Sequence, residues 1–198
     1  MQICNATTAA QYFHLLRRQV HQEVHKPLVV FTPKSLLRSP RAFSDLDEFT
    51  QGHFHEALDD PAFADGGDRD PEDVRTVVLA TGKVAYDIMA EHDERELDVP
   101  VVRLEQVYPF PGAQLVDILD RYPNATDVCW AQEEPGNMGA WTFVSGLLLE
   151  VLVELDDGRS LRHAARKPSP SPATGQHVIH EQEQQRLLAD VLDPVESD

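Results

Sequence analysis

The sequence predicts an α/β fold, with a mostly parallel sheet flanked by helices and an incomplete β-α-β piece in front of it. The main observation is that short apolar runs alternate with helical stretches of about 10–15 residues from position 74 onwards. Such spacing favours crossover connections between parallel strands. A second observation is one β-α-β pattern that stands apart at the N-terminus. A sharp change of charge separates it from the rest of the chain.

The N-terminal piece begins with a short strand at residues 2–5, after which Thr7-Thr8 is suited to cap a helix over 9–25. A proline ends that helix, and the apolar run at 27–32 reads as a buried strand. Two strands and one helix cannot bury their apolar faces alone. We therefore expect part of this helix and of the second strand to be exposed in an isolated chain, as a patch that promotes association.

Residues 39–73 are predicted as an acidic linker that contains at most a short helix or strand. The first 38 residues carry five basic residues against one acid, Glu23. Positions 45–73 instead carry eleven acids against one base, Arg69. Such a switch usually marks a segment boundary.

The regular alternation over residues 74–193 predicts one α/β domain, followed by a tail at 194–198. Three prolines before the last helix predict a stiff, extended loop. The expected strands are 76–81, 99–106, 127–132 and 161–166, and the expected helices are 83–96, 112–122, 139–154 and 177–192.

The formal net charge of −17 argues against nucleic-acid binding, because no surplus of Lys and Arg is present to neutralise phosphates. No apolar run approaches the roughly 20 residues of a membrane span, and the first residues do not read as a signal peptide. We expect a cytoplasmic protein, or one of the mitochondrial matrix if the source is eukaryotic. Cys4 and Cys129 lie in apolar segments and are expected to be buried free thiols.

The most informative segment is residues 132–141, which read Gln-Glu-Glu-Pro-Gly-Asn-Met-Gly-Ala-Trp. A strand that runs into such a turn and then a helix presents a site at the carboxyl edge of an open sheet. Glu133 and Glu134 could form an acid/base pair, but neighbours on a strand point to opposite faces. We expect one of them, with Asn137, to cap the next helix or to contact another subunit. The predicted structural or dimer-contact set is Glu133, Glu134, Asn137, Gly139 and Trp141.

This segment resembles the Glu-Glu-Pro-x-Asn-x-Gly-Ala-Trp signature of thiamine-dependent 2-oxo acid dehydrogenases. Gln-Tyr-Phe-His-Leu-Leu-Arg-Arg-Gln at 11–19 and Pro-Ala-Thr-Gly at 172–175 favour the 2-oxoglutarate member. Almost the whole chain is similar, in order, to the C-terminal portion of the decarboxylating component of 2-oxoglutarate dehydrogenase. The matching segments are 1–8, 11–19, 26–38, 103–111, 132–141 and 171–175.

The resemblance implies that residues 1–38 are the last β-α-β unit of a pyrimidine-binding domain and that 74–193 form a transketolase-type C-terminal domain. Full-length members bind thiamine diphosphate and Mg²⁺, form homodimers and work with a dihydrolipoyl succinyltransferase component. The family's Gly-Asp-Gly motif and its Glu-His-Ser-Ser-Ala-Arg segment have no match here; Gly67-Asp68-Arg69 is a linker turn. We therefore predict no catalytic, cofactor-binding or metal-binding residue on this chain, and no catalysis by it alone.

An effector site is a further prediction. Thr81, Gly82 and Lys83 lie where a strand meets a helix N-terminus, a place that favours anions, and Arg103 ends the neighbouring strand. The resemblance adds that some family members bind nucleotide or acyl-CoA effectors in this domain. Plain surface charge is the alternative. The paired histidines of the chain have no third ligand at a metal-binding spacing, so we read them as solvated helix faces.

Three roles remain open for the chain. It is a C-terminal piece that contributes dimer assembly, active-site shaping and effector binding to a longer enzyme; or a standalone split subunit or binding module; or a degenerate fragment without function. The acidic stretch at 59–73 slightly favours the second and third readings, because an added charged linker suits a piece that must stay soluble.

Overall fold

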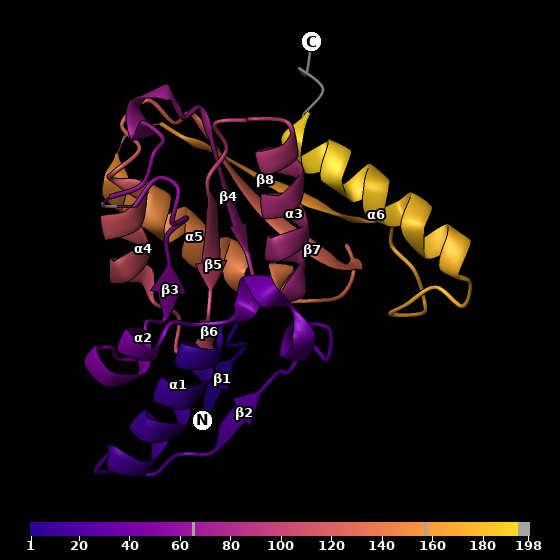
Figure 1. The fold of residues 1–198 in the computed structure, drawn as a ribbon. Helices are drawn as coiled ribbons and strands as arrows, with labels where there is room; N and C mark the ends of the chain where they lie inside the picture. Colours follow the sequence, from indigo (N-terminus) through magenta and orange to yellow (C-terminus); the bar gives the residue numbers. More distant parts are fainter. Residues whose placement is uncertain (65, 157, 194–198) are drawn as a thin grey trace.

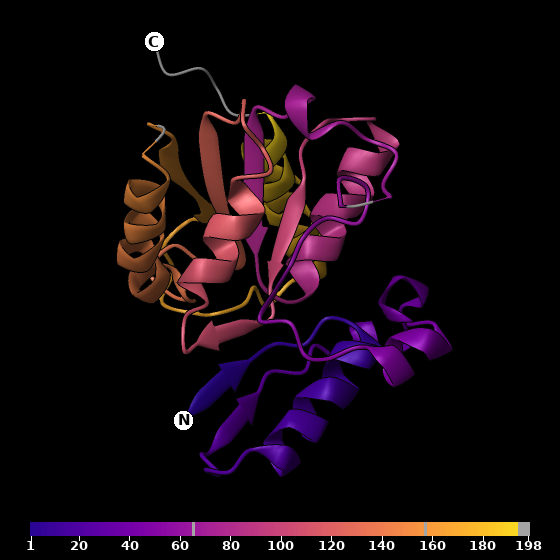
Figure 2. The same cartoon turned by 90° about the vertical axis from the view of Figure 1, so that its left-hand side faces the viewer.

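The computed structural model describes residues 1–64, 66–156 and 158–193, and it forms an α/β structure with two sheets (Figures 1 and 2). The predicted tail at 194–198 lies outside these residues. The larger sheet has the strand order β3-β5-β4-β7-β8, and the smaller sheet has the order β2-β1-β6. Both sheets are mixed, since each contains one antiparallel pair, β3 with β5 and β1 with β6.

The larger sheet is built from the apolar runs that the sequence marks as strands. Its parallel strands are β5 (Val101–Leu104), β4 (Thr76–Ala80), β7 (Asp127–Pro135) and β8 (Ser160–Arg166). The short strand β3 (Ala57–Leu58) lies at its edge. Consecutive side chains of a strand point to opposite faces, so both faces of these apolar strands need a cover.

Helices supply that cover on both faces (Figure 1). On one face, Val77 and Leu79 pack with α4 (Gly112–Leu119) and α5 (Trp141–Leu155). On the other face, Val78 and Ala80 pack with α3 (Lys83–Glu94) and α6 (His177–Leu192). The alternation along a single strand therefore separates the two cores.

The smaller sheet corrects one predicted strand. The run at 99–106 was expected to be continuous, but β5 ends at Leu104 and β6 (Gln106–Tyr108) pairs with β1 (Gln2–Cys4). Glu105 lies between the two strands, where the chain leaves the larger sheet for the smaller one. The β-α-β unit therefore gains a third strand from the C-terminal part of the chain.

The first helix, α1 (Ala9–His21), begins as the sequence predicts, because the Thr8 hydroxyl accepts a hydrogen bond from the Gln11 amide. It ends at His21 and not near residue 25. β2 (Leu28–Val30) follows and pairs with β1 in parallel. Leu15 packs with Cys4 and Phe54 in a small core.

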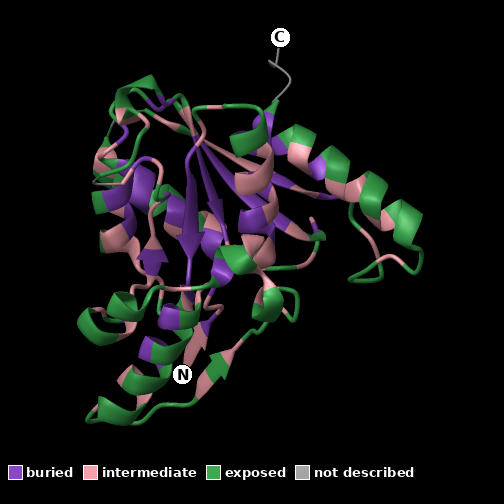
Figure 3. Cartoon of the chain, viewed as in Figure 1, coloured by how far each residue is buried: buried purple, intermediate pink, exposed green. Residues whose placement is uncertain are grey.

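The outer side of this unit is exposed, as the sequence predicts (Figure 3). The side chains that carry the exposure lie on α1, on β2 and in the segments that flank β2. The large apolar residues concerned are Tyr12, Phe13, Leu16, Val20, Val24, Val29 and Phe31, and their exposed fractions run from 40% to 72%.

Residues 39–73 contain more structure than a linker with one short element. A 3-10 turn at Pro40–Ala42, which follows another at Leu36–Arg38 just before this segment, precedes α2 (Leu46–Gln51), and a capping box of Asp45 and Glu48 begins α2. β3 and a 3-10 turn at Pro71–Asp73 follow, and Phe63 packs in the core beneath α4 and α5. The boundaries of the predicted domains stay a prediction.

Cys4 and Cys129 are free and buried, as predicted. Burial raises the pKa of the Cys4 thiol to about 11 and that of Cys129 to about 12, so both are protonated near neutral pH. None of the helices in the described part of the chain is long and apolar enough to cross a membrane.

Candidate functional site

The segment at residues 132–141 is organised by Gln132, a buried polar residue of β7. Its Oε1 accepts hydrogen bonds from the Trp130 indole at 3.0 Å and from the Trp141 amide at 3.2 Å. Its Nε2 donates to the Met138 carbonyl at 2.7 Å. One amide side chain therefore joins the strand, the turn and the first residue of α5.

The predicted side-chain cap of α5 is wrong, while the alternative, a contact with another subunit, stays a prediction. Ala140 occupies the N-cap position and makes no side-chain cap. Neither glutamate takes that place; the Gln132 oxygen accepts from the first helical amide instead. Asn137 bonds in both directions with the Ser169 backbone, at 3.0 Å each, and so ties the turn to the proline-rich loop.

Gly139 is required for the close approach of Gln132. Its φ of +73° is in the left-handed region that favours glycine, and an added Cβ would lie 2.6 Å from the Gln132 Nε2. Trp141 is half-buried and stacks on the His163 ring, with centroids 4.3 Å apart and planes within 10°. Burial lowers the pKa of His163, which favours the neutral ring in this stack.

Glu133 belongs to a polar network and not to an acid/base pair with Glu134, which is exposed. Lys83 at the start of α3 pairs with Glu133 at 3.3 Å and with Asp87 at 2.5 Å. Asp87 also accepts from Gln184 of α6 at 2.8 Å, and Gln184 in turn accepts from Arg166 at 2.8 Å. These contacts link α3 and α6 to β7 and β8 near the carboxyl ends of these two strands.

The predicted effector residues lie in two different environments. Lys83 is held between two carboxylates, so an anionic effector would compete with Glu133 and Asp87 for its charge. Thr81 donates to the Leu104 carbonyl at 2.9 Å, and Gly82, at φ +74°, lies against the Asn5 side chain. Arg103 is 7% exposed and points to the N-terminal unit. Effector binding there stays a prediction.

The Arg103 guanidinium is part of the junction between the two sheets. It donates to the Thr7 hydroxyl and the Tyr86 hydroxyl, both at 3.2 Å. Glu105, which is fully buried, accepts from the Thr7 amide at 2.7 Å and from the Thr7 hydroxyl at 2.5 Å. The Tyr86 hydroxyl donates to the Thr7 carbonyl at 3.0 Å, so every polar group of Thr7 is engaged.

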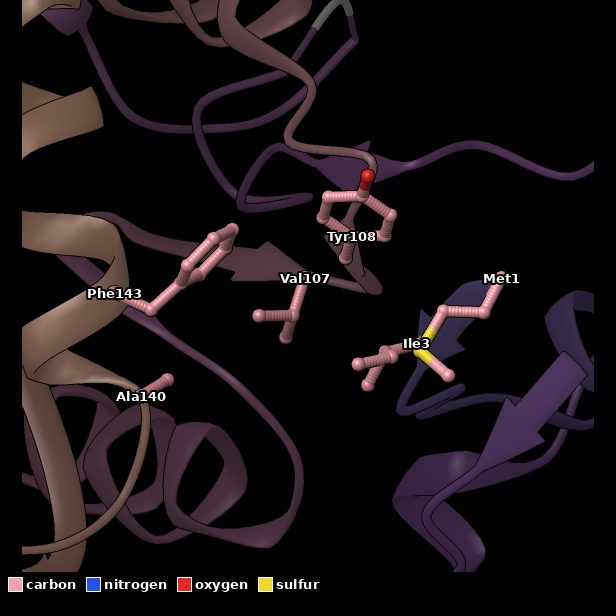
Figure 4. A pocket seen from close by; sticks show the side chains of 6 residues that line it. All are labelled: Met1, Ile3, Val107, Tyr108, Ala140 and Phe143. Atoms are coloured by element: carbon pink, nitrogen blue, oxygen red, sulfur yellow. The ribbon is translucent and has the colours of Figure 1, made fainter.

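An apolar cavity of about 390 Å³ lies beside this junction and the 132–141 turn (Figure 4). Met1 and Ile3 from the N-terminal strand line one side, and Val107 and Tyr108 from β6 lie between them and α5. Ala140 and Phe143 from the start of α5 line the other side. The centroids of the Phe143 and Tyr108 rings are 6.1 Å apart, and both side chains are close to half exposed. Exposed aromatic side chains of this kind are typical of surfaces that bind another protein or domain.

Within the described ranges, no group of three or more His, Cys, Asp or Glu side chains could hold a metal ion. Two residues that organise the region were missed by sequence reasoning, Gln132 and Glu105. Gln132 stands at the head of the quoted motif, whereas for Glu105 the only local signal was a charged residue inside a largely apolar run.

Comparison with known proteins gives a family. A family model described as "2-oxoglutarate dehydrogenase C-terminal" matches residues 43–192. The 2-oxoglutarate dehydrogenase E1 component of Cupriavidus necator is 44% identical over 189 residues, which cover 95% of this chain and 19% of that protein. The E1 component of a Geobacillus strain is 42% identical over 191 residues, with 94% and 19% covered.

A third relative, the multifunctional 2-oxoglutarate metabolism enzyme of a Mycobacterium strain, is 39% identical over 195 residues, which are 98% of this chain and 15% of that enzyme. The chain thus spans about a fifth or less of the length of these relatives. The similarity runs through the N-terminal unit as well as the larger sheet. The chain belongs to the 2-oxoglutarate dehydrogenase C-terminal family.

Proposed function

We propose that this chain is the C-terminal part of a 2-oxoglutarate dehydrogenase (succinyl-transferring) E1 component, in which it contributes to assembly and to the shape of the active site. The observation that carries the proposal is the open apolar surface of α1 and β2. It belongs to a chain that matches relatives about five times its length. A surface of this kind is expected to be covered by the rest of such a protein.

The role of the chain's own residues follows from the junction. Thr7, Arg103 and Glu105 fix the N-terminal unit against the larger sheet, and Gln132 fixes the turn beside the apolar cavity. Together these residues fix the position of the exposed apolar face of α1 relative to the part of the cavity that Phe143 lines. Surfaces positioned in this way are suited to hold a partner subunit or the catalytic domains.

Catalysis by this chain alone is not part of the proposal. Thiamine diphosphate and Mg²⁺ belong to the full-length E1 component, where they would supply the decarboxylation chemistry. The residues described here do not fit these groups, as no acidic cluster for Mg²⁺ is present among them. We place the chemistry in the parts of the enzyme that the match does not span.

The proposal includes partners and location. We infer a homodimer of the full-length component, docking to a dihydrolipoyl succinyltransferase, and a cytoplasmic location or the mitochondrial matrix in a eukaryote. An anionic effector near Lys83 and Arg103 is the least supported part, because both side chains already pair with groups of this chain.

A chimera tests the proposal. This chain replaces the corresponding 19% of the Cupriavidus necator component, and 2-oxoglutarate decarboxylation is measured with thiamine diphosphate and Mg²⁺. We expect an active dimeric chimera and no activity from the chain alone. A matched chimera with Leu16→Asp, on the exposed α1 face, should lose dimer or activity, whereas Arg186→Asp on the exposed side of α6 should not.

The outcomes separate the alternatives. Decarboxylation by the isolated chain would refute the proposal, and so would a chimera that folds and dimerises without any activity. Activity of the truncated component that is restored when this chain is added as a separate polypeptide would favour the split-subunit reading.

A further inference from the structure

A basic cavity lies on the N-terminal unit, away from the 132–141 turn. It has a volume of about 500 Å³ and opens between α1 and the segment that leads into β3. His14, Arg17, Arg18 and His21 line it from the helix, and His53 and Glu56 line it from the opposite segment. The four helical positions follow i, i+3, i+4 and i+7 spacing, which places them on one face of α1.

The charge of this cavity is opposite to that of the chain. Acids outnumber Lys and Arg by 34 to 17 overall, but Glu56 is the acid among the lining residues. Arg18 pairs with Glu56 at 2.7 Å, and its guanidinium lies 4.2 Å above the Phe54 ring. Within the described residues the Arg17 side chain makes no ion pair, so its charge is left without a partner there.

Several donors of this cavity are unused. Within the described residues, the side chains of Arg17, His21 and His53 make no hydrogen bond or ion pair. His14 is 3% exposed, and its Nε2 lies 2.7 Å from the Glu48 carbonyl oxygen, to which it must donate. Its Nδ1 is buried without a hydrogen-bond partner, and so is the Arg18 Nε. Buried polar atoms usually have partners, so these two indicate a missing one.

We propose that this cavity binds a small oxyanion, a carboxylate or a phosphoryl group, between Arg17, His21 and His53. Arg17 supplies the permanent charge and the forked donors that match two oxygens of such a group. His21 and His53 are exposed and place ring nitrogens beside the same cavity. His14 also lines the cavity, and its Nδ1 is the buried ring nitrogen without a hydrogen-bond partner.

Two other groups face the site. Glu56 opposes an anion but is already paired with Arg18. His55 lies against His53 with ring centroids 4.0 Å apart, and burial lowers the pKa of His55, which favours its neutral ring. The positive charge that an anion would meet therefore comes from Arg17.

Titration calorimetry of the 198-residue chain with inorganic phosphate and with succinate, at pH 6.0 and constant ionic strength in chloride, tests the proposal. We expect saturable one-to-one binding with a Kd of about 1 mM or lower. Binding of phosphate alone assigns a phosphoryl ligand, and binding of succinate alone assigns a carboxylate.

Matched variants locate the site. Arg17→Gln should weaken binding by about tenfold or more, and Arg17→Lys should restore part of it. Arg186→Gln, an exposed arginine of α6, is the control and should leave binding unchanged. His53→Gln should also weaken binding, whereas His177→Gln, at an exposed position of α6, should not. No saturable heat with either anion at pH 6.0, or an equal loss in Arg17→Gln and Arg186→Gln, would overturn the proposal.

Discussion

Both carboxylate oxygens of Glu105 accept hydrogen bonds from one residue, Thr7, whose amide and hydroxyl lie 2.7 and 2.5 Å away. Glu105 stands where the chain passes from the larger sheet to the smaller one, and Thr7 precedes α1. The contact thus joins residues 98 positions apart and fixes the N-terminal unit on the C-terminal part. Because the pair is fully enclosed, each of its bonds lacks competition from water.

Thr7→Val should destabilise the chain. The valine keeps the shape of the side chain but removes the hydroxyl donor, so one Glu105 oxygen and the Arg103 guanidinium each lose a partner. We expect a loss of about 1–3 kcal/mol in the free energy of unfolding, measured in urea. The control Thr50→Val, at an exposed position of α2, should change it by about 0.5 kcal/mol or less. Equal effects of the two substitutions would contradict the stabilising role of Thr7 at the junction between the two sheets.

Glu105→Gln should change how stability depends on pH. Burial raises the pKa of the Glu105 carboxyl above its usual 4.5, and the Arg103 charge opposes this only in part. The folded state therefore holds a proton that the unfolded state has released, so Glu105 stabilises the fold fully below about pH 4.5 and less as the pH rises through the folded pKa.

The pH test compares the two proteins between pH 5 and 8 by urea unfolding. The stability of the natural chain relative to Glu105→Gln should fall as the pH rises, since the glutamine does not titrate. A difference that stays constant, or that grows in favour of the natural chain, would show that burial does not raise the pKa of Glu105.

The sequence predicted the α/β class and the positions of most strands of the larger sheet, for a local reason. β4 and β7 contain apolar runs, and helical stretches of ordinary length lie between the strands. The break at Glu105 was not predicted, because residues 99–106 read locally as one strand. Only the pairing of β6 with β1, a contact between distant parts of the chain, shows where the chain passes from the larger sheet to the smaller one.

The candidate site was predicted less completely. The motif at 132–141 was recognised, but the cap was sought in the turn and is supplied by Gln132 from the preceding strand. Sequence spacing placed His21 and Arg17 on α1, yet nothing local brings His53 to the same cavity. Such contacts depend on the tertiary packing of α1 against the segment before β3.

Gln132→Ala should loosen the whole turn. The change leaves the Trp130 indole, the Trp141 amide and the Met138 carbonyl without their partner in a buried place. We expect a loss of about 2–4 kcal/mol in the free energy of unfolding and a changed near-ultraviolet circular dichroism signal from the two tryptophans. Gln185→Ala, at an exposed position of α6, serves as the control and should leave both measurements unchanged.

Gly139→Ala should be destabilising, whereas Gly146→Ala should not. At Gly139 the backbone is left-handed and a new Cβ meets the Gln132 amide at 2.6 Å, so about 1–3 kcal/mol of unfolding free energy should be lost. At Gly146, within α5, the new Cβ meets nothing within 4 Å, and alanine should stabilise the helix by up to about 1 kcal/mol. Thermal unfolding of both variants checks the pair, and a loss of the same size in each would rule out the special role of Gly139.

Limited proteolysis should divide the chain at the N-terminal unit. Residues 74–192 form two cores beneath four helices, whereas the unit of α1 and β2 exposes its apolar side chains and has a small core of its own. We expect cleavage within the first 40 residues at protease concentrations that leave the larger sheet intact, followed by mass spectrometry. Thr7→Val should speed this early cleavage, since it loosens the junction that holds the unit. Equal protection of both regions in the natural chain would contradict the division into two parts.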